Sequence, residues 1–199
     1  MQCILREKLL IQGRKLSDIS NIYQIDSSRF VNAYMHWLEE AEKDLSVLRS
    51  PISIILQSEK SSLNSVLDGF LPDRIQPEKS IRKIHKAAAA QSLEKISKEF
   101  YAKIESIDLM FDQMNEKLCH AVAVLASKDH ELFEKLQLNE KGVGIIWRKL
   151  GMLPETIPIF NYFSAKLSST DINYILMDIM QKIASNKTIG SQERHHSHS

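Results

Sequence analysis

The sequence has few of the residues that interrupt regular structure, since only six of its 199 residues are glycine and five are proline. That content excludes collagen-like and low-complexity chains. Hydrophobic residues make up 43% and charged residues 26%, which excludes the weakly hydrophobic, highly charged type of chain that stays disordered. We therefore expect a folded protein that is long enough for one domain or two small ones.

Cysteine and long apolar runs are also scarce. Two cysteines, Cys3 and Cys119, cannot build a disulfide framework. Charges at Arg6, Glu7 and Lys8 interrupt the N-terminal region, which leaves no apolar stretch of signal-peptide length. No window approaches the roughly 18 apolar residues of a transmembrane helix. The sequence therefore predicts a cytoplasmic protein with reduced thiols and no membrane span.

An excess of charge of one sign is missing as well, because 26 basic residues face 25 acidic ones. Proteins that bind nucleic acid usually carry a clear positive excess, since phosphate neutralisation dominates their affinity. No quarter of this chain is strongly basic or acidic. Nucleic acid is therefore not the expected partner.

Apolar residues recur at steps of three and four over most of the chain, which predicts an all-α fold. At the N-terminus, residues 2–12 form the first predicted helix, and Gly13 is its predicted end. The pattern of residues 14–26 leaves two alternatives open, a helical turn followed by a loop or a short extended segment.

The next two predicted helices meet at Ser50-Pro51, because serine is a good N-cap and proline suits the first helical position. Gly69 is expected just beyond the end of the second of these helices. Seven apolar residues share one face of the first: Phe30, Tyr34, Trp37, Leu38, Ala41, Leu45 and Leu48. We expect this face to lie in the core.

One very long helix is predicted over about residues 78–128, where the chain has no glycine and no proline. Its apolar face, from Ile81 to Leu125, repeats about every 3.67 residues, which favours a globular bundle over a long dimeric coiled coil. The preceding residues 71–77, with Pro72 and Pro77, are predicted to form a stiff loop.

A set of shorter helices is predicted after residue 128, and together the predicted helices indicate a single all-α domain over residues 1–186. Within it, residues 28–128 would form a bundle of long helices and residues 129–186 a short-helix subdomain. The boundaries of the short helices are predicted as an N-cap at Ser127, a turn at Gly142–Gly144, an end at Gly151 and an N-cap at Ser169 or Thr170.

Residues 187–199 are predicted to be a flexible polar tail with little to bury. The tail contains three histidines, His195, His196 and His198, to which we assign no function.

Four side chains on the long helix suggest a metal site: Asp108, Asp112, Glu116 and His120 recur at every fourth position. Ferritin-like metal sites need Glu-x-x-His on two helices, whereas this chain has a single Glu-x-x-x-His. The one set that could face it is His36 with Glu39 and Glu40. We therefore predict a solvated face with no metal and no cofactor. A metal-dependent helical-bundle enzyme using this face is the alternative hypothesis.

Other catalytic motifs are incomplete or missing. His130-Glu131 begins like the zinc-binding His-Glu-x-x-His motif but lacks the second histidine. No Gly-x-Gly-x-x-Gly, P-loop, Gly-x-Ser-x-Gly or Cys-x-x-Cys pattern occurs. The sequence therefore favours a protein that is not an enzyme.

Two groups of residues are predicted to bind a partner. The first is a basic set at the start of the long helix: Lys79, Arg82, Lys83 and Lys86. Cations there oppose the helix dipole by about 0.3–1 kcal/mol each, which suggests a use in binding an acidic surface. The second group is aromatic, because Phe160, Tyr162 and Phe163 cannot all point into one core at about 100° per residue. We predict a contiguous partner-binding patch that includes Tyr162 or Phe163, with help from the basic set.

The resulting hypothesis is a non-enzymatic helical protein–protein interaction module, an adaptor or chaperone-like subunit of a larger assembly. Small helical adaptors of bacterial secretion machines share this general fold character, which is an analogy at the level of fold. The predicted partner is another protein, and the sequence leaves its identity and the oligomeric state open. A nucleic-acid-binding protein is the weakest alternative.

Overall fold

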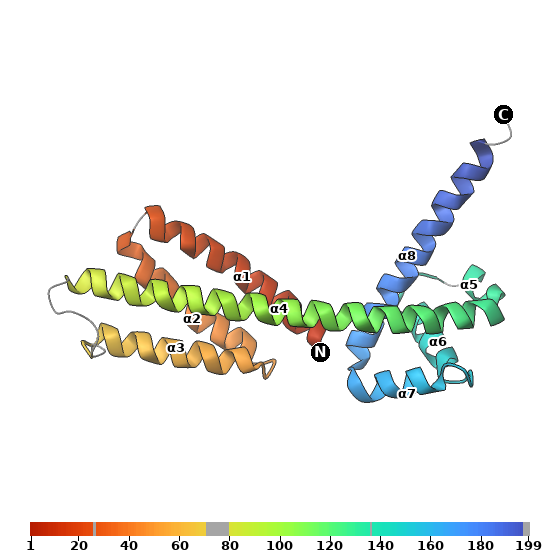
Figure 1. The fold of residues 1–199 in the computed structure, drawn as a ribbon, viewed down its shortest axis with the longest axis horizontal. Helices are drawn as coiled ribbons and strands as arrows, with labels where there is room; N and C mark the ends of the chain where they lie inside the picture. Colours follow the sequence, from red (N-terminus) through yellow and green to blue (C-terminus); the bar gives the residue numbers. More distant parts are fainter. Residues whose placement is uncertain (26, 71–79, 136, 197–199) are drawn as a thin grey trace. The chain divides into compact units, whose positions relative to one another are not determined.

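The computed structural model describes residues 1–25, 27–70, 80–135 and 137–196. These residues form α-helices and their connections, with no strand among them (Figure 1). The helices are α1 (Gln2–Ile25), α2 (Ser27–Ser46), α3 (Pro51–Leu67), α4 (Ile81–Lys128), α5 (His130–Lys135), α6 (Glu140–Leu150), α7 (Ile157–Lys166) and α8 (Ser169–His196). The predicted all-α fold, with one very long helix and shorter helices after it, is confirmed.

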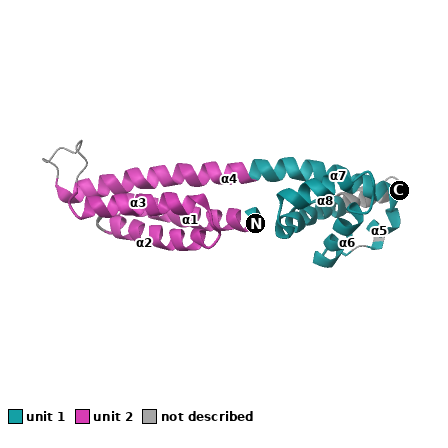
Figure 2. Ribbon diagram, turned by 90° about the horizontal axis from the view of Figure 1, so that it is seen from below, with its two compact units in different colours: residues 1–3, 108–199 teal, residues 4–107 magenta. Residues whose placement is uncertain are grey.

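The chain divides into two compact units (Figure 2). Residues 4–107 form one, which we call the N-terminal unit; residues 1–3 and 108–199 form the other, the C-terminal unit. The division falls inside α4, whereas the change in helix length along the sequence suggested a subdomain boundary near residue 128. None of the helices in the described part of the chain is long and apolar enough to cross a membrane.

Helix α1 continues through Gly13, so the predicted end of the helix at this residue is wrong. Its buried face continues on both sides of the glycine: Leu5, Leu9, Gln12, Leu16 and Ile19. A glycine inside a helix costs about 1 kcal/mol relative to alanine. Burying Leu16 and Ile19 contributes about 1.5–3 kcal/mol for each side chain. Packing of the second half of α1 therefore outweighs the local preference of the glycine.

Helices α2 and α3 end in the same kind of motif. At the end of α2, the Arg49 N–H donates to the Ser46 carbonyl at 2.9 Å and the Ser50 N–H donates to the Leu45 carbonyl at 3.2 Å. This is the Schellman pattern, which places one residue in the left-handed region. Arg49 occupies that place with φ 51°, and Gly69 occupies the corresponding place after α3 with φ 93°. The predicted role of Gly69 is confirmed.

The junction between α2 and α3 follows the sequence prediction. The Ser50 hydroxyl accepts a hydrogen bond from the Ile52 N–H at 3.3 Å, and Pro51 is the first residue of α3. The loop predicted for residues 71–77 lies outside the described residues.

Aromatic rings from α1, α2 and α4 form a continuous line in the N-terminal unit. Trp37 is only 2% exposed, and its indole N–H donates to the Gln12 carbonyl at 3.2 Å. The hydroxyls of Tyr34 and Ser92 lie 2.9 Å apart, which gives a polar residue in the buried face of α4 a partner. In order, the rings are Tyr23, Phe30, Tyr34, Trp37 and Phe100, with neighbouring centroids 5.0 to 6.1 Å apart. The predicted core position of Trp37 is confirmed.

Within the C-terminal unit, α8 crosses α4 and contacts it through two side-chain pairs (Figure 1). The rings of Phe111 and Tyr174 lie 5.4 Å apart, and the Asn115 amide donates to the Asp178 carboxylate at 2.7 Å. Both pairs are separated by 63 positions in the sequence. The second pair lies one helical turn beyond the first on both helices, so both chains advance in the same sense at the crossing.

The predicted boundary at Ser127 is displaced by two residues. Asp129 caps α5, because its Oδ1 accepts a hydrogen bond from the Leu132 N–H at 3.2 Å. The Ser127 hydroxyl instead donates to the Val124 carbonyl inside α4. A serine in the last turn of a helix can bond back to the preceding turn, so its presence did not define an N-cap.

The predicted turn at Gly142–Gly144 is wrong, because both glycines lie inside α6. Asn139 caps this helix: its side-chain oxygen accepts a hydrogen bond from the Gly142 N–H at 3.0 Å. Gly151 closes α6, as predicted, and it also allows a close approach. A Cβ at Gly151 would lie 3.0 Å from the ring of Phe160.

Helix α8 begins at Ser169, with Ser168 rather than Ser169 or Thr170 before its first turn, and continues to His196. The backbone is therefore helical over most of residues 187–199, where the sequence suggested a flexible polar tail.

Candidate partner-binding surfaces

Helix α7 separates the two aromatic residues that the sequence offered as alternatives. Phe163 is fully buried, whereas Tyr162 is 44% exposed. Their ring centroids lie 5.4 Å apart with the planes 84° from parallel, so one ring packs edge-on against the other. The geometry assigns Phe163 to the core and leaves Tyr162 on the surface.

A cation from another helix also contacts the exposed ring. The ammonium nitrogen of Lys117 on α4 lies 5.2 Å from the Tyr162 centroid. A cation over an aromatic face at an exposed position contributes about 0.5–1 kcal/mol. Sequence reasoning missed Lys117, because nothing in its own helix indicates that α7 packs beside it.

The basic set at the start of α4 belongs to the N-terminal unit. Arg82 and Lys83 are exposed, and Lys79 lies outside the described residues. Lys86 is half-buried, with its ammonium nitrogen 4.1 Å from the centroid of Tyr23. Lys86 therefore has a packing role. Tyr162 belongs to the other unit, so we treat the two sets as separate surfaces.

The face considered for a metal is largely solvated. Asp112, Glu116 and His120 are exposed, while Asp108 is half-buried. In the described ranges, no group of three or more histidine, cysteine, aspartate or glutamate side chains is placed to hold a metal ion. The possible facing residue His36 is exposed and belongs to the N-terminal unit.

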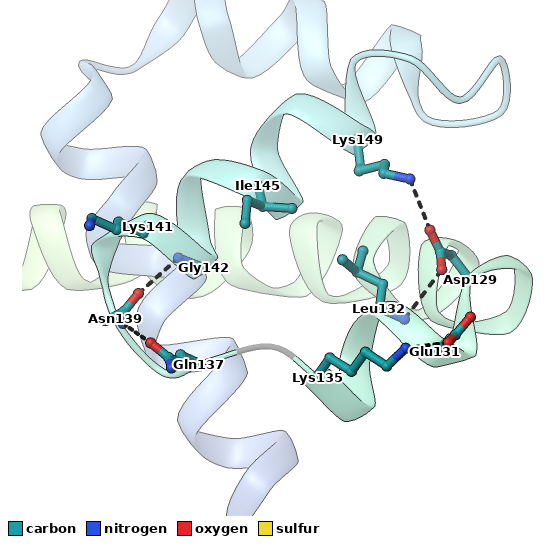
Figure 3. A pocket seen from close by; sticks show the side chains of 10 residues that line it. All are labelled: Asp129, Glu131, Leu132, Lys135, Gln137, Asn139, Lys141, Gly142, Ile145 and Lys149. Carbon is teal, nitrogen blue, oxygen red and sulfur yellow. Dashed lines mark hydrogen bonds and ion pairs between the residues drawn. The ribbon is translucent and has the colours of Figure 1, made fainter.

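A groove between α5 and α6 is a surface that the sequence did not indicate. Its volume is about 590 Å³. Figure 3 shows Leu132 of α5 and Ile145 of α6 facing each other across it. The residues that line it are Asp129, Glu131, Leu132, Lys135, Gln137, Asn139, Lys141, Gly142, Ile145 and Lys149. It therefore combines an apolar centre with a charged rim.

Most of the rim charges are already paired. Asp129 accepts a hydrogen bond from the Lys149 ammonium at 3.0 Å, and this bond holds the pKa of the Asp129 carboxyl below its usual range. Glu131, first noticed for its place after His130, forms an ion pair with Lys135. Lys141 is exposed and has no hydrogen bond or ion pair with any described residue.

A buried carboxylate, Asp171, joins the start of α8 to residues 1–3. It is 1% exposed and accepts hydrogen bonds from the Cys3 N–H at 2.9 Å and the Ser168 hydroxyl at 2.7 Å. The α-amino nitrogen of Met1 lies 2.8 Å away. Burial alone would raise the pKa of Asp171, but these donors outweigh burial and hold the pKa well below its usual range. This carboxylate stabilises the C-terminal unit and is not open to a ligand.

Two surfaces of the C-terminal unit are thus available to a partner, the exposed ring of Tyr162 and the groove between α5 and α6. Their geometry is the basis for a functional argument. No family model, curated protein or solved structure matches this chain.

Proposed function

We propose that this protein is a non-enzymatic helical protein–protein interaction module that serves as an adaptor or chaperone-like subunit of a larger assembly. The observation that carries the proposal is the exposed ring of Tyr162, which contacts both the ring of Phe163 and the ammonium of Lys117. Tyrosine is one of the residues that most often dominate the binding energy of protein interfaces.

The placement of Tyr162 also lowers the entropic cost of binding. Its ring contacts Phe163 and Lys117 before a partner arrives, so less rotamer freedom remains to be lost on binding. An aromatic ring supplies a large contact area, and the tyrosine hydroxyl supplies a hydrogen bond at the edge. These properties suit an anchor for a partner protein.

The test compares three single variants in binding to the partner recovered from the native source by pull-down and mass spectrometry. Tyr162→Ala is expected to melt like the parent and to weaken binding by about 2 kcal/mol, roughly 30-fold. Tyr101→Ala is the matched control, because Tyr101 is 73% exposed but belongs to the N-terminal unit, and it is expected to bind like the parent.

Phe163→Ala provides the structural comparison. We expect it to lower the melting temperature, because a fully buried phenylalanine contributes about 3–5 kcal/mol to stability. Full affinity of Tyr162→Ala for the partner, with unchanged melting, would show that this surface is not the interface.

No specific observation favours the two other hypotheses. The residues considered for a metal-dependent enzyme do not converge within the described part of the chain. The chain lacks the clear positive excess of charge that nucleic-acid-binding proteins usually carry. We therefore propose neither.

A further inference from the structure

We propose that the groove between α5 and α6 is a second binding site, which takes an extended segment of a partner protein with two acidic residues flanking a large apolar one. In this segment the three side chains occupy positions i, i+2 and i+4. The proposal goes beyond the interaction through Tyr162 and does not depend on it.

The apolar centre of the groove supplies the first part of the argument. Ile145 is 40% exposed and Leu132 is half-buried, although both are large apolar residues on helices. Together they line a groove of about 590 Å³, within the roughly 300–1,000 Å³ typical of binding pockets. One large apolar side chain entering between them would remove this surface from water.

The face of α6 supplies the second part. Lys141, Ile145 and Lys149 are spaced by four residues and all line the groove, so this face presents the order cation, apolar, cation. The complementary ligand presents the order anion, apolar, anion. Charge complementarity of this kind fixes the register of a bound segment and suppresses wrong partners.

The groove has cationic groups available for such a ligand. Lys141 has no partner among the described residues. Lys135 pairs with Glu131, but these side chains are 74% and 75% exposed, and exposed pairs within one helix contribute little to stability. Lys149 already pairs with Asp129, whose carboxylate also accepts a hydrogen bond from the Leu132 N–H, so a ligand carboxylate at Lys149 takes the place of an existing exposed partner.

Helix geometry sets the length of the segment. Lys141 and Lys149 are eight positions apart on α6, which separates their Cα atoms by roughly 12 Å at about 1.5 Å per residue. An extended chain covers that distance with about four residues at roughly 3.3 Å each. Alternate side chains of an extended chain point to the same side, so positions i, i+2 and i+4 all face the groove.

The experiment is a titration of the ¹⁵N-labelled full chain, followed by NMR, with the peptide acetyl-Glu-Ala-Leu-Ala-Glu-amide. Saturable shifts of the Gly142 and Ile145 backbone amides are expected. Two control peptides replace both glutamates with lysine or the leucine with alanine. Each is expected to bind at least about fivefold more weakly, since the exchanged contacts contribute about 1 kcal/mol or more.

Two variants place the binding on the groove. Lys141→Glu is expected to weaken binding of the acidic peptide at least about fivefold, because it reverses the one rim cation without a described partner. Lys166→Glu is the matched control, since Lys166 is also exposed but lies at the end of α7, and it is expected to bind like the parent. The affinity of each variant is compared with that of the parent after thermal denaturation has shown that their melting temperatures are equal.

Four results would overturn the proposal. The first is the absence of saturable shifts at Gly142 and Ile145, and the second is equal affinity for the acidic and basic peptides. The third is the same set of shifts with inorganic phosphate alone, which would indicate a simple anion site. The fourth is movement of the two amides with protein concentration in the absence of peptide, which would indicate a second copy of this chain as the occupant.

Discussion

The N-terminal unit and the C-terminal unit both bury apolar side chains, but they do so with helices of different length. In the N-terminal unit, long helices bury continuous apolar faces, and aromatic rings from three helices meet around Trp37. In the C-terminal unit, α5, α6 and α7 have 6, 11 and 10 residues, fewer than the roughly 12–15 that an isolated helix needs in water.

Side-chain groups satisfy the starts of three helices of the C-terminal unit. Asp129 and Asn139 cap α5 and α6, and Ser168 with Asp171 closes the first turn of α8. Caps are not confined to short helices, because Ser50 caps the 17-residue α3 whereas the 10-residue α7 has no side-chain cap. The comparison teaches that the short helices rely on burial against neighbouring helices, since isolated helices of their length are marginal in water.

The largest expected effect is on the stability of the N-terminal unit. Trp37→Ala should lower the free energy of unfolding by about 3–5 kcal/mol, because its ring is buried between those of Tyr34 and Phe100. Urea denaturation gives the size of the loss, and hydrogen exchange locates it. If amide protection falls equally in residues 4–107 and 108–185, the two units do not have the separate cores inferred here.

The second prediction concerns the polar cluster of the other unit. Asp171→Asn should lower the free energy of unfolding by about 2 kcal/mol at pH 7, because the buried carboxylate accepts hydrogen bonds from Cys3 and Ser168 and pairs with the Met1 ammonium. Urea denaturation of parent and variant measures this difference. The exposed Asp112→Asn is the control and should unfold like the parent.

The effect of Asp171 should depend on pH in a defined direction. Its pKa in the folded protein lies below the unfolded value of about 3.9, so its contribution is fully present above that pH. The contribution is lost progressively as the pH falls from there towards the depressed folded pKa. The difference between parent and Asp171→Asn should therefore shrink below about pH 4, and a constant difference from pH 7 to pH 3 would contradict the assignment.

The sequence predicted several features that depend on one helix, although it misplaced the caps at Ser127 and Ser169 or Thr170, and it missed the contacts that join two helices. Ser50, Gly69 and the apolar face of α4 from Ile84 to Leu125 follow from local spacing and were found. Ile81, which was predicted on the same face, is 69% exposed. The predicted helix end at Gly13 was wrong because the helix is continued by the burial of Leu16 and Ile19, which depends on residues from other parts of the chain. The contact of Lys117 with Tyr162 and the groove around Lys141 both join separate helices, so no local pattern indicates them.

The third prediction compares two glycines of α6, one at a close contact just after the helix and one in open space inside it. Gly151→Ala should lower the free energy of unfolding by about 1–2 kcal/mol, because the new Cβ would lie 3.0 Å from the Phe160 ring, which itself packs on Trp147. The control is Gly144→Ala, where a Cβ meets nothing within 4 Å. That change should raise the free energy of unfolding by up to about 1 kcal/mol, as thermal denaturation would show. Stabilisation by both changes would mean that Phe160 moves aside freely.

The smallest expected effect returns to the N-terminal unit. Arg49→Gly should raise the free energy of unfolding by about 0.5–1 kcal/mol, since it relieves a left-handed residue at φ 51° after α2. Differential scanning calorimetry can resolve this gain, and Arg49→Ala should show none because alanine keeps the strain. A gain of the same size for Arg49→Ala would show that the stabilisation comes from removing the arginine charge and not from relieving backbone strain.

The matched spacing of the contacts between α4 and α8 should tolerate substitutions better than insertions. Phe111 contacts Tyr174 and Asn115 contacts Asp178 at the same sequence separation, so both contacts require the same alignment of the two helices. A substitution at one contact leaves the rest in place. One inserted residue in α4 between Phe111 and Asn115 would turn the following part of the helix by about 100° and move it by roughly 1.5 Å. We therefore expect natural relatives to vary in the side chains of this segment and to keep its length.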